Sequence, residues 1–78
     1  MKVLYINLDS RTDRKEHIES IVPLAERVSA IKDERGGYFG CVRSHIKCLK
    51  IALERKYDSV IILEDDFAYK TDTTIFNM

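Results

Sequence analysis

Proline, glycine, cysteine and tryptophan are scarce or missing in this sequence. Among its 78 residues it has one proline, three glycines, two cysteines and no tryptophan. So little proline and glycine, together with 45% hydrophobic residues, argues against disorder and for a folded globular chain. Net charge is also absent, because thirteen basic side chains offset thirteen acidic ones. No overall field draws the chain to nucleic acid or to an anionic membrane, so an anion must be bound locally.

Long hydrophobic runs are missing too. The apolar start, residues 1–8, is too short for a secretory signal and leads directly into charged residues. No stretch is long enough to span a membrane, so we expect a protein of the cytoplasm or another intracellular compartment. Cys41 and Cys48 fit a reducing compartment, because on one predicted helix they cannot pair without unwinding it. We interpret both as small hydrophobic side chains rather than as metal ligands or nucleophiles.

The sequence does contain a regular alternation of strand-like and helix-like stretches. Residues 2–8 and 60–63 are nearly unbroken runs of strand formers, and residues 26–31 form a weaker strand between them. A short amphipathic helix follows the first strand. Its expected N-cap is Ser10, and Pro23 lies just beyond its expected end.

A longer helix, over residues 39–56, has the clearest helical periodicity. We expect one of its faces to lie in the core and the opposite face to lie in water. The expected core face consists of Val42, His45, Leu49, Ala52 and Leu53. The expected solvent face consists of Arg43, Lys47, Lys50 and Glu54.

The order strand, helix, strand, helix, strand predicts a short three-layer α/β unit with a parallel sheet. Right-handed crossovers give the strand order second, first, third, with a crevice at the carboxyl ends of the first and third strands. We expect one α/β domain over residues 1–67, followed by a tail or the start of a truncated helix over residues 68–78. The third strand is expected to keep an open edge, which would pair with a second copy or another chain.

The run Glu64-Asp65-Asp66, directly after the third strand, is the strongest candidate for a site. It is expected to face residues 7–9 across the crevice. Three adjacent carboxylates repel one another unless a cation lies between them or water reaches all three. By itself the run therefore supports a divalent-metal site and a solvated acidic loop about equally.

Other candidates are individually weak. Gly36 and Gly37 before the second helix suit either a phosphate at the helix N-terminus or a simple turn. Arg11 and Arg14 suit either diphosphate oxygens or a solvated helix face. A lone histidine such as His45 is more often a packed structural residue than a ligand.

Together, three blocks of the sequence resemble glycosyltransferase family 25, which includes lipooligosaccharide and procollagen galactosyltransferases. INLDSRTDR at residues 6–14 is similar to the family's INLxxRxxR opening. GYFGCVRSH at residues 37–45 resembles its GxxGCxxSH block, and ILEDD at residues 62–66 resembles its ILEDD signature. The blocks have the order and approximate spacing of the family.

The resemblance implies a Rossmann-like, type A glycosyltransferase fold that binds a nucleotide diphosphate sugar, with UDP-galactose as the expected donor. Glu64, Asp65 and Asp66 would stand in the place of the DxD motif. Asp66 would bind Mn²⁺ or Mg²⁺ bridged to the diphosphate, and Glu64 would contact the metal through water or contact the ribose. The implied donor-binding residues are Asn7, Leu8, Asp9, Arg11, Arg14, Ser44, His45, Glu64 and Asp65.

The resemblance extends over residues 2–67 and corresponds to the family's N-terminal, donor-binding part. The part that binds an acceptor glycan or protein, and the general base, would lie beyond this sequence, so no catalytic residue is assigned. We expect donor binding without transfer by this chain alone. A non-catalytic α/β interaction module is the alternative. A phosphatase-like site at Asp65 and Asp66 ranks last, because the DxDxT spacing is missing.

Overall fold

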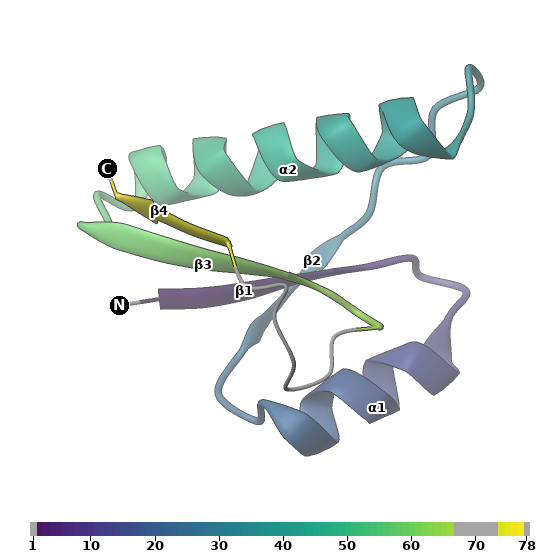
Figure 1. The fold of residues 1–78 in the computed structure, drawn as a ribbon, viewed down its shortest axis with the longest axis horizontal. Coiled ribbons are helices and arrows are strands. Elements are labelled where there is room, and N and C mark those ends of the chain that lie inside the picture. Colours follow the sequence, from purple (N-terminus) through teal and green to yellow (C-terminus); the bar gives the residue numbers. More distant parts are fainter. Residues whose placement is uncertain (1, 67–73, 78) are drawn as a thin grey trace.

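The computed structural model describes residues 2–66 and 74–77. Four strands form one sheet in the order β2-β1-β3-β4, and two helices pack on it (Figure 1). The strands are β1 (Lys2–Asn7), β2 (Glu26–Ser29), β3 (Ser59–Glu64) and β4 (Thr74–Asn77). The helices are α1 (Thr12–Ile21) and α2 (Gly37–Glu54).

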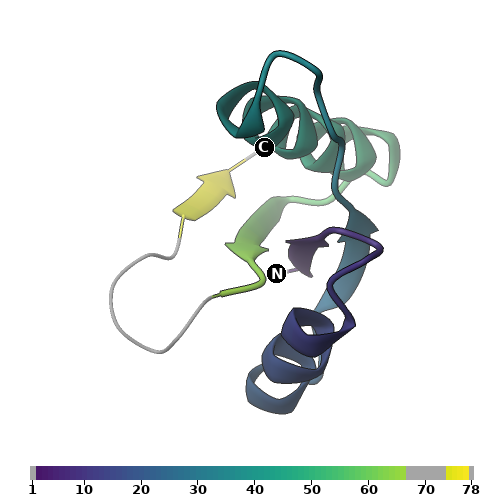
Figure 2. The same cartoon turned by 90° about the vertical axis from the view of Figure 1, so that its right-hand side faces the viewer.

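The predicted α/β unit is confirmed. Strands β1, β2 and β3 are parallel, and β1 lies between the other two, as the order second, first, third requires. Helices α1 and α2 cover opposite faces of the sheet, which gives three layers (Figures 1 and 2). The carboxyl ends of β1 and β3 therefore meet at one edge, where Ile6 pairs with Glu64.

The expected open edge of β3 is wrong. Strand β4 pairs antiparallel with β3, from Ser59 opposite Asn77 to Ile62 opposite Thr74. Residues 74–77 are thus a strand, where a tail or the start of a helix was expected, and residues 68–73 lie outside the described part. Thr, Ile and Phe are good strand formers, and this segment pairs with the backbone groups of β3. The pairing with a second chain at this edge loses its structural basis.

The start of α1 also differs from the prediction. The helix begins at Thr12 with Arg11 at the N-cap, and no side chain caps it. Ser10 is not the cap because a turn, in which the Arg11 amide donates to the Leu8 carbonyl over 2.9 Å, precedes the helix. The helix ends at Ile21, close to Pro23 as predicted.

Helix α2 packs on the sheet through a face that only partly coincides with the one expected. Its buried residues are Gly40, Ser44, Cys48 and Ala52, one every fourth position. Of the residues expected in the core, Ala52 is buried and Leu49 packs against the core cluster, whereas Val42 and Leu53 are exposed. Lys47, which was expected in water, is half-buried and donates to the Ser29 carbonyl over 3.0 Å.

The bulk of the sheet explains this rotation of α2. The sheet presents large aliphatic side chains to the helix, so small helix residues allow the closest approach. This core cluster consists of Leu4, Ile6, Val28, Cys48, Ala52, Val60 and Ile62. The opposite face of the sheet packs Tyr5 and Leu63 against Ile18 of α1. No helix in the described part of the chain is long and apolar enough to cross a membrane.

Candidate functional site

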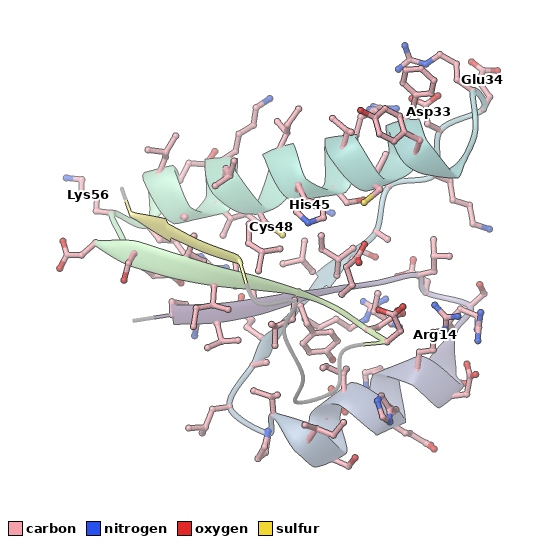
Figure 3. The ribbon with its side chains drawn as sticks, in the orientation of Figure 1. Arg14, Asp33, Glu34, His45, Cys48 and Lys56 are labelled. Carbon is pink, nitrogen blue, oxygen red and sulfur yellow. The ribbon has the colours of Figure 1, made fainter. Side chains whose placement is uncertain are left out.

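A cavity of about 470 Å³ lies where the carboxyl ends of β1 and β3 meet the amino end of α2. Its place is the crevice predicted for this topology. Six charged residues line it: Arg11, Arg14, Lys32, Asp33, Glu64 and Asp65. In Figure 3, Arg14 on α1 and Asp33 before α2 lie at the same end of the molecule, in the two outer layers.

Asp65 faces the protein interior. It is almost fully buried, and the side-chain amide of Asn7 donates to its Oδ2 atom over 2.9 Å. Arg14 contacts Oδ1 of Asp65 over 3.4 Å. The Asn7 amide group also donates to the Arg11 carbonyl, and its Oδ1 accepts from Nε of Arg27, each over 3.0 Å. Asn7 and Asp65 therefore join the ends of β1 and β3 to the start of α1.

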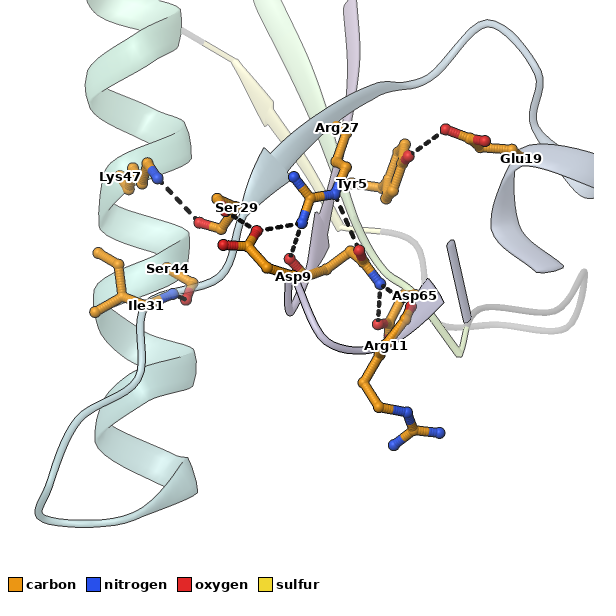
Figure 4. Close-up of polar contacts among 11 residues, drawn as sticks. Tyr5, Asp9, Arg11, Glu19, Arg27, Ser29, Ile31, Ser44, Lys47 and Asp65 are labelled. Carbon is orange, nitrogen blue, oxygen red and sulfur yellow. Dashed lines mark hydrogen bonds and ion pairs between the residues drawn. The ribbon is translucent and has the colours of Figure 1, made fainter. Parts of the chain in front are cut away.

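Asp9 is held beside β2. Its Oδ1 atom accepts hydrogen bonds from Arg27 and from the Ser29 hydroxyl (Figure 4). The Arg27 hydrogen bond holds the pKa of the Asp9 carboxyl below its usual range, with the Ser29 hydrogen bond as the second cause. Arg27 also donates to the Asn7 carbonyl over 3.1 Å. Arg27 thus organises the loop after β1, and no sequence pattern marks it as a functional residue.

The amino end of α2 approaches the cavity through its glycines. Gly36 has φ 122° and ψ 176°, a conformation that only glycine adopts readily, and no side chain caps the helix there. A Cβ atom at Gly40 would lie only 2.7 Å from the Ile31 carbonyl oxygen. The glycines therefore serve the turn and the close packing, and they leave the positive end of the helix dipole beside the cavity.

Ser44 and His45 are both occupied by contacts within the protein. The buried Ser44 hydroxyl accepts from the Ile31 amide over 2.9 Å and donates to the Gly40 carbonyl over 2.7 Å. Nδ1 of His45 donates to the Cys41 carbonyl over 2.9 Å. Ser44 lines the cavity and fixes its wall, whereas His45 does not line it.

Cys41 joins the second block to the third. Its thiol donates to Oε1 of Glu64 over 3.4 Å and lies 3.6 Å from Nδ1 of His45. Burial, followed by the hydrogen bond to Glu64, raises the pKa of the Cys41 thiol. A protonated thiol is a poor nucleophile, which agrees with the interpretation of Cys41 as a structural residue.

The exposed carboxylates at the end of β3 are those of Glu64 and Asp66. Among residues 2–66 and 74–77, no group of three or more His, Cys, Asp or Glu side chains could hold a metal ion. Carboxylate oxygens are the kind of ligand that Mn²⁺ and Mg²⁺ prefer, and these ions often take their other ligands from substrate phosphates and water. Of the two exposed carboxylates, Glu64 lines the cavity and Asp66 follows just beyond its lining. Asp65 lines the cavity as well, with its carboxylate already held by Asn7 and Arg14.

Three basic and three acidic side chains line the cavity, and most of them are in ion pairs. The Asp33 side chain is buried between Arg35, 2.9 Å away, and Arg43, 3.2 Å away. The hydrogen bond from the Arg35 side chain is the main cause that holds the pKa of Asp33 well below its usual range. Lys32 lines the cavity as well. The sequence did not predict a role for Lys32 or Asp33, because both lie in an irregular loop.

Comparisons of the chain with family models, with curated proteins and with solved structures find no match.

Proposed function

We propose that this chain binds a nucleotide diphosphate sugar, as the donor-binding part of a protein like those of glycosyltransferase family 25. The observation that carries the proposal is the convergence of the three resembling blocks on one cavity. The first block contributes Leu8, Arg11 and Arg14. The second contributes Gly37, Gly40, Cys41 and Ser44, and the third contributes Glu64 and Asp65. These blocks are far apart in the sequence, so their meeting supports a shared ligand.

The charges around the cavity suit a diphosphate. Arg11, Arg14 and Lys32 are cationic, and the amino end of α2 adds partial positive charge. A volume of about 470 Å³ also lies in the range of small-molecule sites. UDP-galactose is the donor that we propose, and the acceptor would be a glycan or a protein.

A divalent metal belongs to this proposal. Glu64 and Asp66 would hold Mn²⁺ or Mg²⁺ through their exposed carboxylates, and the ion would supply charge neutralisation for a leaving nucleotide diphosphate. Asp65 would position the ends of β1 and β3 rather than touch the ligand. Asn7 and Asp9 would act in the same way, because their side chains are engaged with Arg27.

Isothermal calorimetry with UDP-galactose tests the proposal. We expect binding that requires Mn²⁺ and that disappears when the metal is chelated. UDP and galactose titrated separately show which half of the donor supplies the affinity. An absence of heat at millimolar UDP-galactose with Mn²⁺ would refute the proposal.

A further inference from the structure

The described chain leaves a second apolar face of helix α2 largely uncovered, with Leu49 packed partly against the core cluster. The face consists of Phe39, Val42, Ile46, Leu49 and Leu53, and we call it the outer seam. Phe39 and Val42 are each 40% exposed, Ile46 is 46% exposed and Leu53 is 64% exposed, while Leu49 is half-buried. In Figure 1, no helix or strand lies over the side of α2 that points away from the sheet.

The spacing of the outer seam is that of a coiled coil. Its residues follow one another at intervals of three, four, three and four, which are the a and d positions of two heptads. The seam is about 21 Å long at the rise of an α-helix. Single exposed apolar residues are ordinary, whereas a continuous stripe marks an interaction surface. Because the small-residue face of α2 already packs on the sheet, the seam is free to receive another helix.

One border of the seam is basic. Arg43 and Lys50 occupy the e positions beside it, and Lys47 and Glu54 lie one position further round on the same side, which leaves a net positive charge. Within residues 2–66, Lys50 has no carboxylate partner, and Arg43 shares Asp33 with Arg35. A second copy packed antiparallel would bring Arg43 of one chain near Lys50 of the other, and like charges there are unfavourable. The border is complementary to acidic side chains instead.

The amino end of the seam has the features of a binding anchor. The Arg35 guanidinium lies 4.4 Å from the centre of the Phe39 ring. Tyr38 and Phe39 make an edge-to-face contact with ring centres 5.6 Å apart. Aromatic and arginine side chains held in place in this way commonly dominate binding energy at protein interfaces.

From these features we infer that the outer seam docks an amphipathic helix of another protein that carries Glu or Asp beside its apolar stripe. The apolar residues of that helix pack between Phe39, Ile46 and Leu53, and its acids face Arg43 and Lys50. The narrow a and d stripe favours a helix over a membrane surface, which binds helices with a wider apolar face. This docking does not depend on the proposed nucleotide site.

A labelled helical peptide of about three heptads provides the probe. It has Leu at a and d and Glu at e and g, and a matched peptide has Lys in place of each Glu. Both peptides repel their own copies, so self-association affects them equally. Fluorescence anisotropy should show that the acidic peptide binds at least about tenfold more tightly, with an advantage that shrinks as salt is added.

Variants of the full chain locate the binding surface. We expect Ile46→Glu and Leu53→Glu to weaken binding of the acidic peptide by about tenfold or more. Both positions are exposed, so the circular dichroism spectrum should not change. Leu24→Glu is the matched control, because Leu24 is 89% exposed and lies outside α2. Binding of UDP-galactose to the two seam variants should equal that of the parent chain, which separates this inference from the proposed function.

Four results would overturn the inference. The first is no binding of the acidic peptide at high micromolar concentration. The second is equal affinity for the acidic and basic peptides, or a loss of affinity for the acidic peptide in Leu24→Glu as large as in the two seam variants. The third is sedimentation of the chain as a dimer that Ile46→Glu disrupts, since a second copy would then occupy the seam. The fourth is co-sedimentation with phosphatidylserine vesicles that the same variant abolishes.

Discussion

Asn7 at the end of β1 donates a hydrogen bond of 2.9 Å to Asp65, the residue after β3, and both side chains are almost fully buried. The contact joins two residues that are 58 positions apart. It draws one member of the acidic run into the protein and leaves Glu64 and Asp66 exposed. The carboxylates of the run therefore differ in burial and in partners, and variants can test them separately.

Replacing Asn7 should destabilise the fold. Asn7→Ala removes the amide partner of the buried Asp65 carboxylate and the acceptor of Nε of Arg27. Leaving such groups unpaired costs about 2–3 kcal/mol in the free energy of unfolding. Urea denaturation measures this change. The exposed Ser10→Ala serves as control, with an expected change below about 0.5 kcal/mol. Equal losses in the two variants would contradict a structural role for the Asn7 amide.

Gly40 should not tolerate a side chain. A Cβ atom there would lie 2.7 Å from the Ile31 carbonyl oxygen, which is a backbone atom and cannot rotate away. We expect Gly40→Ala to lower the free energy of unfolding by about 1–3 kcal/mol. Gly37→Ala is the control, because a Cβ atom at Gly37 meets nothing within 4 Å. A Gly40→Ala chain as stable as Gly37→Ala would show that the contact between α2 and Ile31 is looser than described.

The buried Tyr5 should make stability fall in alkaline solution. Burial, together with the 2.6 Å hydrogen bond that it donates to Glu19, raises the pKa of Tyr5 from 10.0 to about 12 (Figure 4). Above pH 10 the unfolded chain loses this proton while the folded chain keeps it. The stability contributed by Tyr5 is therefore complete below pH 10 and is lost as the pH rises towards 12, by about 2–3 kcal/mol in all.

Denaturation at several pH values measures this loss, with Tyr5→Phe as the comparison. Cys48, whose pKa burial raises from 9.0 to about 11, contributes a second loss at lower pH in both chains. The difference between the parent chain and Tyr5→Phe isolates the tyrosine. If the two curves run parallel between pH 10 and pH 12, the expected shift of Tyr5 is wrong.

Asp66 should affect ligand binding and not stability. Its carboxylate is exposed at the end of β3, so Asp66→Asn should change the free energy of unfolding by less than about 0.5 kcal/mol. We expect the same variant to weaken Mn²⁺-dependent binding of UDP-galactose by about tenfold or more, because an amide is a poor ligand for this ion. Asp58→Asn provides the control, since Asp58 is exposed at the opposite end of β3. Equal affinities in the two variants would exclude Asp66 as a metal ligand.

The α/β class, the parallel order of the first three strands and the edge at which the acids lie could all be predicted from the amino-acid sequence. These features depend on local patterns. Runs of strand formers, helical periodicity and the handedness of crossovers each act over short stretches of chain. The resemblance of three blocks to a known family also came from the sequence alone, and the cavity that they share supplies a testable site.

The burial of individual side chains in those elements depends on tertiary packing and could not be predicted in this way. Helix α2 has apolar residues on both faces. The face with small side chains, including Ser44 and Cys48, is the one that packs against the large aliphatic side chains of the sheet. Asp65 is buried, unlike Glu64 and Asp66, because Asn7 and Arg14 contact its carboxylate at the edge of the sheet. Strand β4 pairs with β3 through backbone hydrogen bonds, and the pattern of its side chains does not predict this pairing. Each of these outcomes depends on partners distant in sequence, and periodicity carries no information about them.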